Sequence, residues 1–406
     1  MAIGEIPPTS QEASSPMAVT ESDVREAAGA VQDPRLRLSL AELGLVGAVE
    51  VGGGDVRLEL ALPVPDHPGL DQLAAEVRRA LGALEGVDSV ELRTAPMDDE
   101  GRARLRDRLR AAMGASPGND DGARQGGGGP GRPLGHEEGK ANPFSRPGAR
   151  TRVVGVSSGK GGVGKSSVTV NLAVSLARLG HAVGVLDADV YGFSMPRMLG
   201  LDETPVVIED LMVPPVAHGV ACISMGFFVG EDQPVIWRGP MLHKALEQFL
   251  ADVYWGTLDY LLIDMPPGTG DVALSMAQYL PRSEVLVVTT PQPAAQRVAQ
   301  RSAYMAKKVG LALRGVVENM AWFTGDDGTR YELFGSGGGQ QLADELAVPL
   351  LGQVPLVAAL REGGDVGVPV TVADPGGEVA RAFEALAKRM EELGPTRVFR
   401  SELTVR

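Results

Sequence analysis

A glycine-rich segment in the middle of the chain has the residue types and the spacing that bind phosphate. Gly159 and Gly164 lie five residues apart, and Lys165 and Ser166 follow at once, which is the phosphate-loop pattern. Glycines let backbone N–H groups converge on phosphate oxygens, and the helix that begins there adds the positive end of its dipole. We predict a nucleoside triphosphate site made by Gly159, Lys160, Gly161, Gly162, Val163, Gly164, Lys165, Ser166 and Ser167.

Two side chains of this loop have expected partners. Lys165 is expected to reach the β- and γ-phosphates, and the Ser166 hydroxyl is expected to be a ligand of Mg²⁺. The alternative is a glycine-rich turn with an exposed lysine. The position of the loop between a predicted strand and an amphipathic helix favours the phosphate site.

Two aspartates at the ends of predicted strands are candidates for the metal and for the water that attacks the phosphate. Asp264 ends the run Leu261-Leu262-Ile263, which is where a carboxylate that supports Mg²⁺ belongs. Asp189 follows another strand and is expected to orient or polarise the attacking water. Either aspartate alone could instead be a helix cap or a turn residue, but the nearby phosphate loop favours the catalytic interpretation.

The elements that must position these residues alternate between strands and helices. Short continuous apolar runs are typical of strands that are covered on both faces of a parallel sheet. The predicted strands are Arg152–Ser157, Ala182–Asp187, Val220–Met225, Tyr260–Asp264, Val285–Thr289, Leu313–Glu318 and Leu350–Val354. The predicted fold class is therefore α/β, with a doubly wound, mostly parallel sheet forming a P-loop NTPase domain over residues 151–394.

A smaller domain of another type precedes the sheet. Residues 21–113 combine helical spacing with alternating strand patterns, such as the run Val56–Leu62, and they predict a small α+β module. This module has no cysteine, and we predict that it is a docking domain rather than a catalytic one. Three further segments are a disordered start (1–20), a flexible Gly- and Pro-rich tether (114–150) and a C-terminal tail (395–406).

Composition excludes several classes of function. The 406 residues are 44% hydrophobic, which suffices for two or three folded units. The net charge of −14 argues against a chain that wraps nucleic acid or coats an anionic membrane. No signal peptide and no run of 18 apolar residues is found, and the single cysteine excludes an intrachain disulfide. We therefore predict a cytoplasmic protein.

Further motifs give the chain a family resemblance. With the loop and its extra lysine, Lys160, they resemble the deviant-loop P-loop ATPases, the class that contains MinD, ParA and nitrogenase iron protein. Within this class the chain resembles the Mrp/ApbC family of iron–sulfur cluster carrier ATPases, from Arg152 to about Thr371. The N-terminal module resembles the small domain of bacterial Mrp proteins. The motifs are Asp187–Gly200, Ile236–Met241, Asp264–Asp271, Val317–Met320 and Phe334–Gly339.

The resemblance implies an ATP-hydrolysing homodimer that serves iron–sulfur client or scaffold proteins. It implies that Lys160 reaches the nucleotide of the partner subunit. It also implies that Asn319 contacts adenine, although a local backbone contact is the alternative for this asparagine. Asp189 lies in the first switch segment, and Asp264–Asp271 forms the second. The predicted catalytic residues are Lys160, Lys165, Asp189 and Asp264.

The cysteine content departs from the family pattern. Family carriers have a Cys-X-X-Cys after the Glu-Asn-Met segment, through which two subunits share a [4Fe–4S] cluster. Here that stretch, Trp322–Tyr331, has no cysteine, and Asp326 and Asp327 predict a turn between two strands. Cys222 lies in an apolar strand pattern and is expected to be buried. It is the one cysteine of the chain, so a dimer would have two and could not supply four thiolates. ATP and Mg²⁺ are the expected cofactors, and a [4Fe–4S] cluster would need ligands from a partner.

Two other functions remain open on the sequence alone. One is a nucleotide-dependent switch that positions cargo, as MinD and ParA do. The mixed charges of Glu378–Leu393 and the acidic total disfavour membrane or DNA binding by such a switch. The other is an adaptor without a cluster, in which hydrolysis is vestigial. The complete set of loop lysines and aspartates disfavours it.

Overall fold

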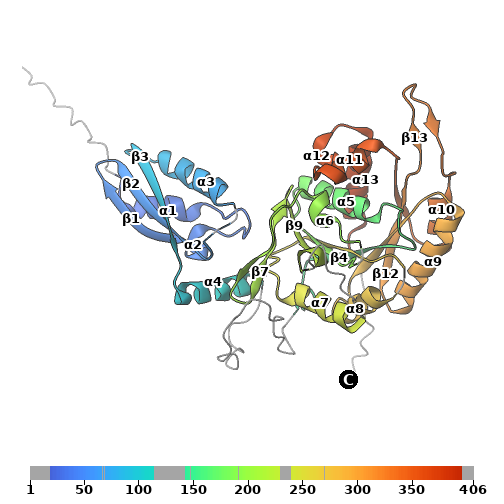
Figure 1. The fold of residues 1–406 in the computed structure, drawn as a ribbon, viewed down its shortest axis with the longest axis horizontal. Helices are drawn as coiled ribbons and strands as arrows, with labels where there is room; N and C mark the ends of the chain where they lie inside the picture. The colour runs from blue at the N-terminus through green and yellow to red at the C-terminus, as the bar shows by residue number, and fades with distance from the viewer. Residues whose placement is uncertain are drawn as a thin grey trace, which may run out of the picture. The chain divides into compact units, whose positions relative to one another are not determined.

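The structure is a computed structural model, and it describes residues 19–65, 67, 69–113, 142–146, 148–190, 192–228, 239–268 and 270–395. The chain divides into two compact units, Met1–Arg108 and Leu109–Arg406 (Figure 1). Most of the predicted disordered start, of the predicted tether and of the predicted tail lies outside the described residues.

The smaller unit is built on a three-stranded sheet in the order β1-β2-β3. The β1–β2 pair is antiparallel and the β2–β3 pair is parallel. Along β2, Val56, Leu58 and Leu60 are buried while the residues between them are more exposed, as their alternation predicts. The small α+β fold is confirmed. Its elements are α1 (Glu21–Ala30), α2 (Leu40–Leu43), β1 (Val46–Gly52), β2 (Asp55–Leu62), α3 (Leu70–Gly82) and β3 (Ser89–Pro96), and α4 (Asp99–Ala112) follows in the chain.

The larger unit contains an eight-stranded sheet in the order β15-β12-β11-β4-β10-β5-β9-β8. Neighbouring strands run parallel, except that β8 pairs antiparallel with β9 at one edge. The predicted mostly parallel α/β sheet is confirmed, and the seven predicted strands are all present. The strands are β4 (Arg152–Ser158), β5 (Val183–Asp187), β8 (Val216–Ala217), β9 (Val220–Ser224), β10 (Tyr260–Asp264), β11 (Glu284–Thr289), β12 (Ala312–Asn319) and β15 (Leu350–Val354).

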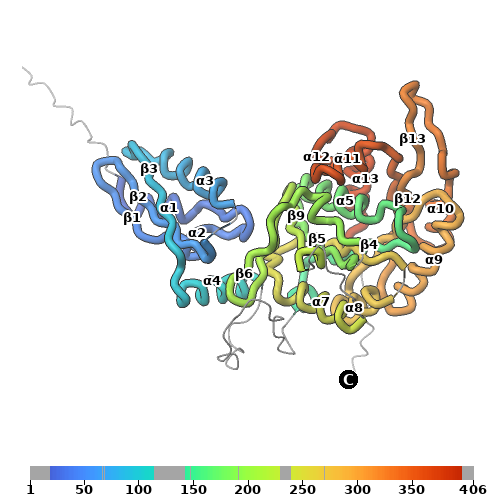
Figure 2. Tube along the Cα trace, viewed as in Figure 1, coloured from blue at the N-terminus to red at the C-terminus, as the bar shows by residue number. Residues whose placement is uncertain are grey.

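Helices cover both faces of this sheet, and one hydrophobic cluster lies under each layer (Figures 1 and 2). One layer contains α5 (Lys165–Arg178), α6 (Met195–Met198), α11 (Ala358–Val366), α12 (Val370–Ala373) and α13 (Glu378–Leu393). The other contains α7 (Gly239–Ala251), α8 (Asp271–Tyr279), α9 (Pro293–Lys308) and α10 (Gly338–Leu346). Strands buried on both faces explain the continuous apolar runs in the sequence. Among the described helices, none has the length and apolarity needed to cross a membrane.

Short elements were not placed by the sequence patterns. A hairpin of β6 (Val206–Ile208) and β7 (Leu211–Val213) and the 3₁₀ turn η1 (Met225–Phe228) are too short to show a period. A second hairpin joins β13 (Phe323–Thr324) to β14 (Arg330–Tyr331). Its connection confirms the turn that was predicted at Asp326 and Asp327.

The predicted tether requires a correction at its C-terminal end. Phe144 is 7% exposed, and its ring meets the ring of Trp255 edge-on, with 6.4 Å between the ring centroids. The Asn142 side chain donates a hydrogen bond to the Tyr279 carbonyl over 2.9 Å. An aromatic side chain in a sequence rich in Gly and Pro can anchor a segment that its composition marks as flexible. Residues 142–146 therefore pack on the larger unit.

Candidate functional site

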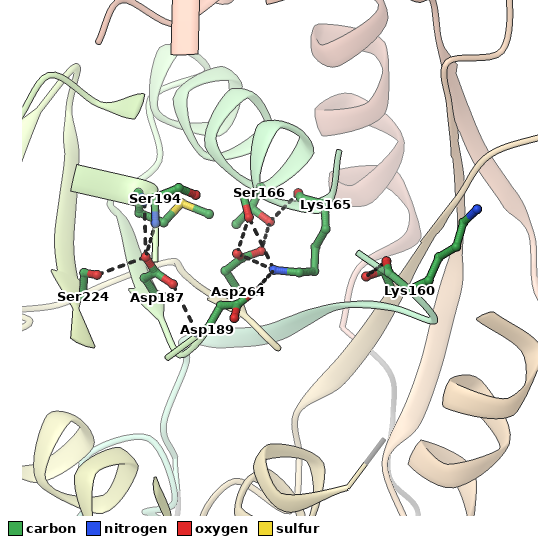
Figure 3. Close-up of polar contacts among 11 residues, drawn as sticks. Lys160, Lys165, Ser166, Asp187, Asp189, Ser194, Ser224 and Asp264 are labelled. Atoms are coloured by element: carbon green, nitrogen blue, oxygen red, sulfur yellow. Dashed lines mark hydrogen bonds and ion pairs between the residues drawn. The ribbon is translucent and has the colours of Figure 1, made fainter. Parts of the chain in front are cut away.

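The topology of the sheet brings the predicted site residues to one edge. β10 lies between β4 and β5, and Asp264 at its end is in register with Val156 of β4 and Asp187 of β5. The carboxyl ends of these three parallel strands therefore lie side by side. The loop that follows β4, Asp264 and the segment that begins at Asp187 surround one polar centre (Figure 3).

The glycines of the loop are required by its geometry. Gly162 and Gly164 have φ angles of 82° and 77°, which favour glycine. A Cβ at Gly159 would lie 2.2 Å from backbone atoms of Val298 and Ala299, so the loop packs directly against α9. Gly164 precedes α5 and offers no side-chain cap. The first N–H groups of α5 therefore point toward the place where an anion would bind.

Asp264 is the centre of the site and is fully buried. Its Oδ2 accepts hydrogen bonds from Lys165 Nζ over 2.5 Å and from Ser166 Oγ over 2.7 Å. Its Oδ1 accepts one from Thr169 Oγ1 over 2.8 Å. Burial raises the pKa of Asp264, while Lys165 and the hydroxyl donors oppose this shift. Thr169 was not predicted, although it lies four residues after Lys165 and thus on the same face of α5.

Two further buried aspartates, Asp187 and Asp189, lie near Lys165 and Asp264. Asp189 Oδ2 lies 3.5 Å from Lys165 Nζ, and Asp189 Oδ1 is buried with no hydrogen-bond partner among the described residues. Asp187 is fully buried, and its pKa is raised to about 7, chiefly by burial and then by the charge of Asp264. The sequence reasoning gave Asp187 no role. Its position at the end of a strand, two residues before Asp189, was the available signal.

The other two predicted side chains lie at the margins of the loop. Lys160 Nζ is 3.5 Å from Gln292 Oε1, and the side chain extends away from Asp264 (Figure 3). Asn319 Nδ2 donates a hydrogen bond to the Val163 carbonyl over 2.9 Å. The backbone contact that was the alternative for Asn319 is therefore present. Its Oδ1 is buried and has no partner within the described part of the chain, so it can still accept a hydrogen bond from a ligand.

The donors of this centre fit a triphosphate with Mg²⁺. Lys165 and the backbone N–H groups of the loop are suited to phosphate oxygens. The Ser166 hydroxyl and the Asp264 carboxylate are hard oxygen ligands of the kind that Mg²⁺ takes. Asp189 Oδ1 is a buried acceptor with unmet hydrogen-bonding capacity. These groups lie around one polar centre, in which Lys165, Asp189 and Asp264 are buried, and together they support phosphate chemistry.

The described residues do not fit an iron–sulfur cluster. Cys222 is fully buried on β9, and burial raises the pKa of its thiol well above the usual value. In the β13–β14 turn, Asp327 Oδ1 accepts the Thr329 N–H over 2.9 Å, which is a turn contact. No group of three or more His, Cys, Asp or Glu residues within the described ranges is arranged to hold a metal ion. Three of the family motifs are only partly described. The residues outside the described ranges are Tyr191, Ile236–Arg238 and Thr269.

Comparison with known proteins confirms the resemblance. Residues 149–391 match the family model described as NUBPL iron-transfer P-loop NTPase, and residues 21–92 match the one described as iron-sulfur cluster assembly protein. The iron-sulfur cluster carrier protein of Mycobacterium tuberculosis is 44% identical over 90% of this chain and 91% of its own length. The iron-sulfur cluster carrier protein of Bacillus subtilis is 39% identical over 83% of this chain and 88% of its own length.

A solved structure also overlaps with the larger unit. It is the nucleotide-binding protein from Archaeoglobus fulgidus in complex with ADP. It is 34% identical, covers 57% of this chain and 91% of its own, and gives a TM-score of 0.49.

The raised pKa of Asp187 predicts a pH-dependent stability. The carboxyl has a pKa of about 7 in the fold and 3.8 as its unperturbed value, so between these values the folded protein binds the extra proton. Stability should therefore fall as pH rises from about 4 to about 7, by an amount on the order of 3–4 kcal/mol from this group. Asp187→Asn should lack this part of the pH dependence.

Urea unfolding at several pH values measures the effect. Trp255 and Trp322 lie in the larger unit, and the chain has no tryptophan before residue 109, so tryptophan fluorescence reports on that unit. Asp202→Asn, at an exposed position, is the matched control and should keep the wild-type slope. Parallel stability curves for wild type and Asp187→Asn would show that the group does not titrate in this window.

Proposed function

We propose, because the chain belongs to the family of iron-transfer P-loop NTPases, that it is an ATP-hydrolysing iron–sulfur cluster carrier that acts in the cytoplasm as a homodimer. The observation that carries the nucleotide part is the buried contact of Lys165 and Ser166 with Asp264 below the glycine loop. The proposed role as a cluster carrier is supported by relatives named iron-sulfur cluster carrier protein, which match most of the chain.

In this proposal, the binding of ATP rearranges the contacts of Lys165. The loop N–H groups and Lys165 Nζ hold the β- and γ-phosphates, so the lysine exchanges its contact with Asp264 for phosphate oxygens. Asp264 and Ser166 would hold Mg²⁺, which would supply positive charge to the phosphates. Asn319 Oδ1, which is buried, accepts a hydrogen bond from the adenine amino group.

Hydrolysis then uses Asp189 and a lysine from each subunit. Asp189 accepts a hydrogen bond from the water whose oxygen forms the new bond to the γ-phosphorus. The bond from that phosphorus to the β–γ bridging oxygen breaks, giving ADP and inorganic phosphate. Lys165 of the same subunit and Lys160 of the partner subunit stabilise the developing charge. The extension of Lys160 away from Asp264 is compatible with a role across the dimer (Figure 3).

The cluster is cargo in this account, and its ligands come from elsewhere. Cys222 is buried within the sheet and cannot present a thiolate to a surface cluster. The thiolates are therefore supplied by the client or scaffold protein. The N-terminal module, which matches the cluster-assembly family over residues 21–92, is proposed to recruit that partner. Nucleotide-driven movement of the switch segments would then change the dimer interface and control the transfer.

Replacement of Lys165 tests the nucleotide part. Lys165→Ala removes the cation that contacts Asp264 and the phosphates, so ATP affinity should fall at least tenfold. Lys308→Ala, at an exposed position near the end of α9, is the matched control and should bind ATP as wild type does. Calorimetric titration with ATP and Mg²⁺ measures both. Equal affinity in wild type and Lys165→Ala would refute the assignment of the loop.

Anaerobic reconstitution with iron and sulfide tests the cargo part. The chain alone should acquire no stoichiometric [4Fe–4S] cluster, because its one cysteine is buried. Wild type and Cys222→Ala should therefore retain the same small amounts of iron and sulfide per dimer. A stoichiometric cluster in wild type that is lost in Cys222→Ala would mean that the thiol is a ligand.

A further inference from the structure

Asp187 bridges the two ends of the segment that carries Asp189. Its Oδ1 accepts the Asp189 N–H over 3.2 Å. Its Oδ2 accepts the N–H groups of Ser194 and Met195 over 3.0 and 3.2 Å. The same Oδ2 accepts the Ser224 hydroxyl at the end of β9 over 3.0 Å (Figure 3). One buried carboxylate thus ties the start and the end of this segment to two neighbouring strands.

We propose that Asp187 is a positioning residue for ATP hydrolysis, which fixes the segment 189–195 so that the Asp189 carboxylate is aimed at the attacking water. This inference rests on the proposed function. The contacts of Asp187 are directed to backbone N–H groups and to Ser224, whereas Lys165 pairs with Asp189 and Asp264.

The beginning of this segment has other contacts besides those with Asp187. Val190 is 5% exposed and lies in a hydrophobic cluster, and the Ala188 N–H donates to the Asp264 carbonyl over 3.0 Å. These contacts do not set the direction of the Asp189 side chain. The Gly192 N–H reaches the Asp189 carbonyl over 3.3 Å, which is a local turn contact. The helix α6 that ends the segment is only four residues long and has no side-chain cap, so it contributes little stability of its own. At its start, Met195 is fully buried. The carboxylate of Asp187 therefore connects an anchored end to the end that carries Asp189.

The Asp187 carboxylate is also held by Ser224, at the end of the neighbouring strand β9. Ser224 Oγ accepts the Gly226 N–H over 3.0 Å while it donates to Asp187. A Cβ at Gly226 would lie 2.4 Å from the Phe193 ring, so residues 193 and 226 are in close contact. The segment is thus fixed at its start, at its end and against η1. Loss of the carboxylate should free the segment without removing any group that touches ATP.

Asparagine is the informative replacement because it is isosteric with aspartate. An amide has one acceptor oxygen and one donor nitrogen, so its nitrogen cannot accept the N–H groups that face it. Asp187→Asn therefore loses either the contact with the Asp189 N–H or the contacts with the Ser194 and Met195 N–H groups. Ser224→Ala is a milder variant that removes one donor and keeps the carboxylate.

A double-mutant cycle separates positioning from a general structural role. We would measure ATP hydrolysis and the binding of a non-hydrolysable ATP analogue for full-length wild type, Asp187→Asn, Asp189→Asn and the double variant. Asp187→Asn should lower kcat at least tenfold and change the analogue Kd less than threefold. In the Asp189→Asn background it should cause no further loss, since it acts through Asp189. Asp202→Asn is the control for surface charge and should be unchanged.

Each other outcome has a definite meaning. Unchanged kcat in Asp187→Asn, or an equal loss in both backgrounds, would overturn the inference and leave the proposed function standing. No hydrolysis by wild type would overturn the proposed function and the inference with it. If Asp187→Asn does not fold, Ser224→Ala replaces it in the same cycle, with an expected two- to fivefold loss of kcat that vanishes in the Asp189→Asn background. Full additivity there would also overturn the inference.

Discussion

The buried charge around Lys165 is the constraint on which the site depends. Asp187, Asp189 and Asp264 are all at most 7% exposed. Among the described ion pairs, Lys165 is the one cation that pairs with Asp189 and Asp264, and none includes Asp187. Burial of unbalanced carboxylates is costly, so such a cluster needs hydrogen-bond donors, a proton or a metal ion. Ser166 and Thr169 supply donors to Asp264, and burial raises the pKa of both Asp187 and Asp264. The same imbalance favours a divalent cation at Asp264.

The order of the strands turns this constraint into a site. Because β10 lies between β4 and β5, Asp264 faces the phosphate loop on one side and Asp187 on the other. The loop can approach this carboxylate because Gly159 packs against the backbone of α9. The residues predicted to bind the nucleotide thus all come from the larger unit. The one cysteine of the chain, Cys222, is buried on β9 and lies apart from them in the fold.

Local sequence signals made most of the fold and most of the polar centre predictable. Continuous apolar runs located the main strands, and the spacing of Gly159, Gly164 and Lys165 located the loop. Thr169 and Asp187 were missed because their roles depend on which face of α5 meets β10 and on the pairing of β5 with β10, both long-range properties. Phe144 was missed because its environment depends on Trp255, far along the chain. The adenine contact predicted for Asn319 and the dimer role of Lys160 stay predictions.

The most direct test of the account is ATP titration of wild type and Asp264→Asn, each with Mg²⁺ and with a chelator. Wild type should bind ATP at least tenfold more tightly with Mg²⁺, because Asp264 and Ser166 hold the ion. Asp264→Asn should lose most of that enhancement. Its affinity without Mg²⁺ should equal or exceed that of wild type, because Lys165 is no longer paired with a carboxylate at position 264. An undiminished effect of Mg²⁺ in Asp264→Asn would contradict the central role given to this carboxylate.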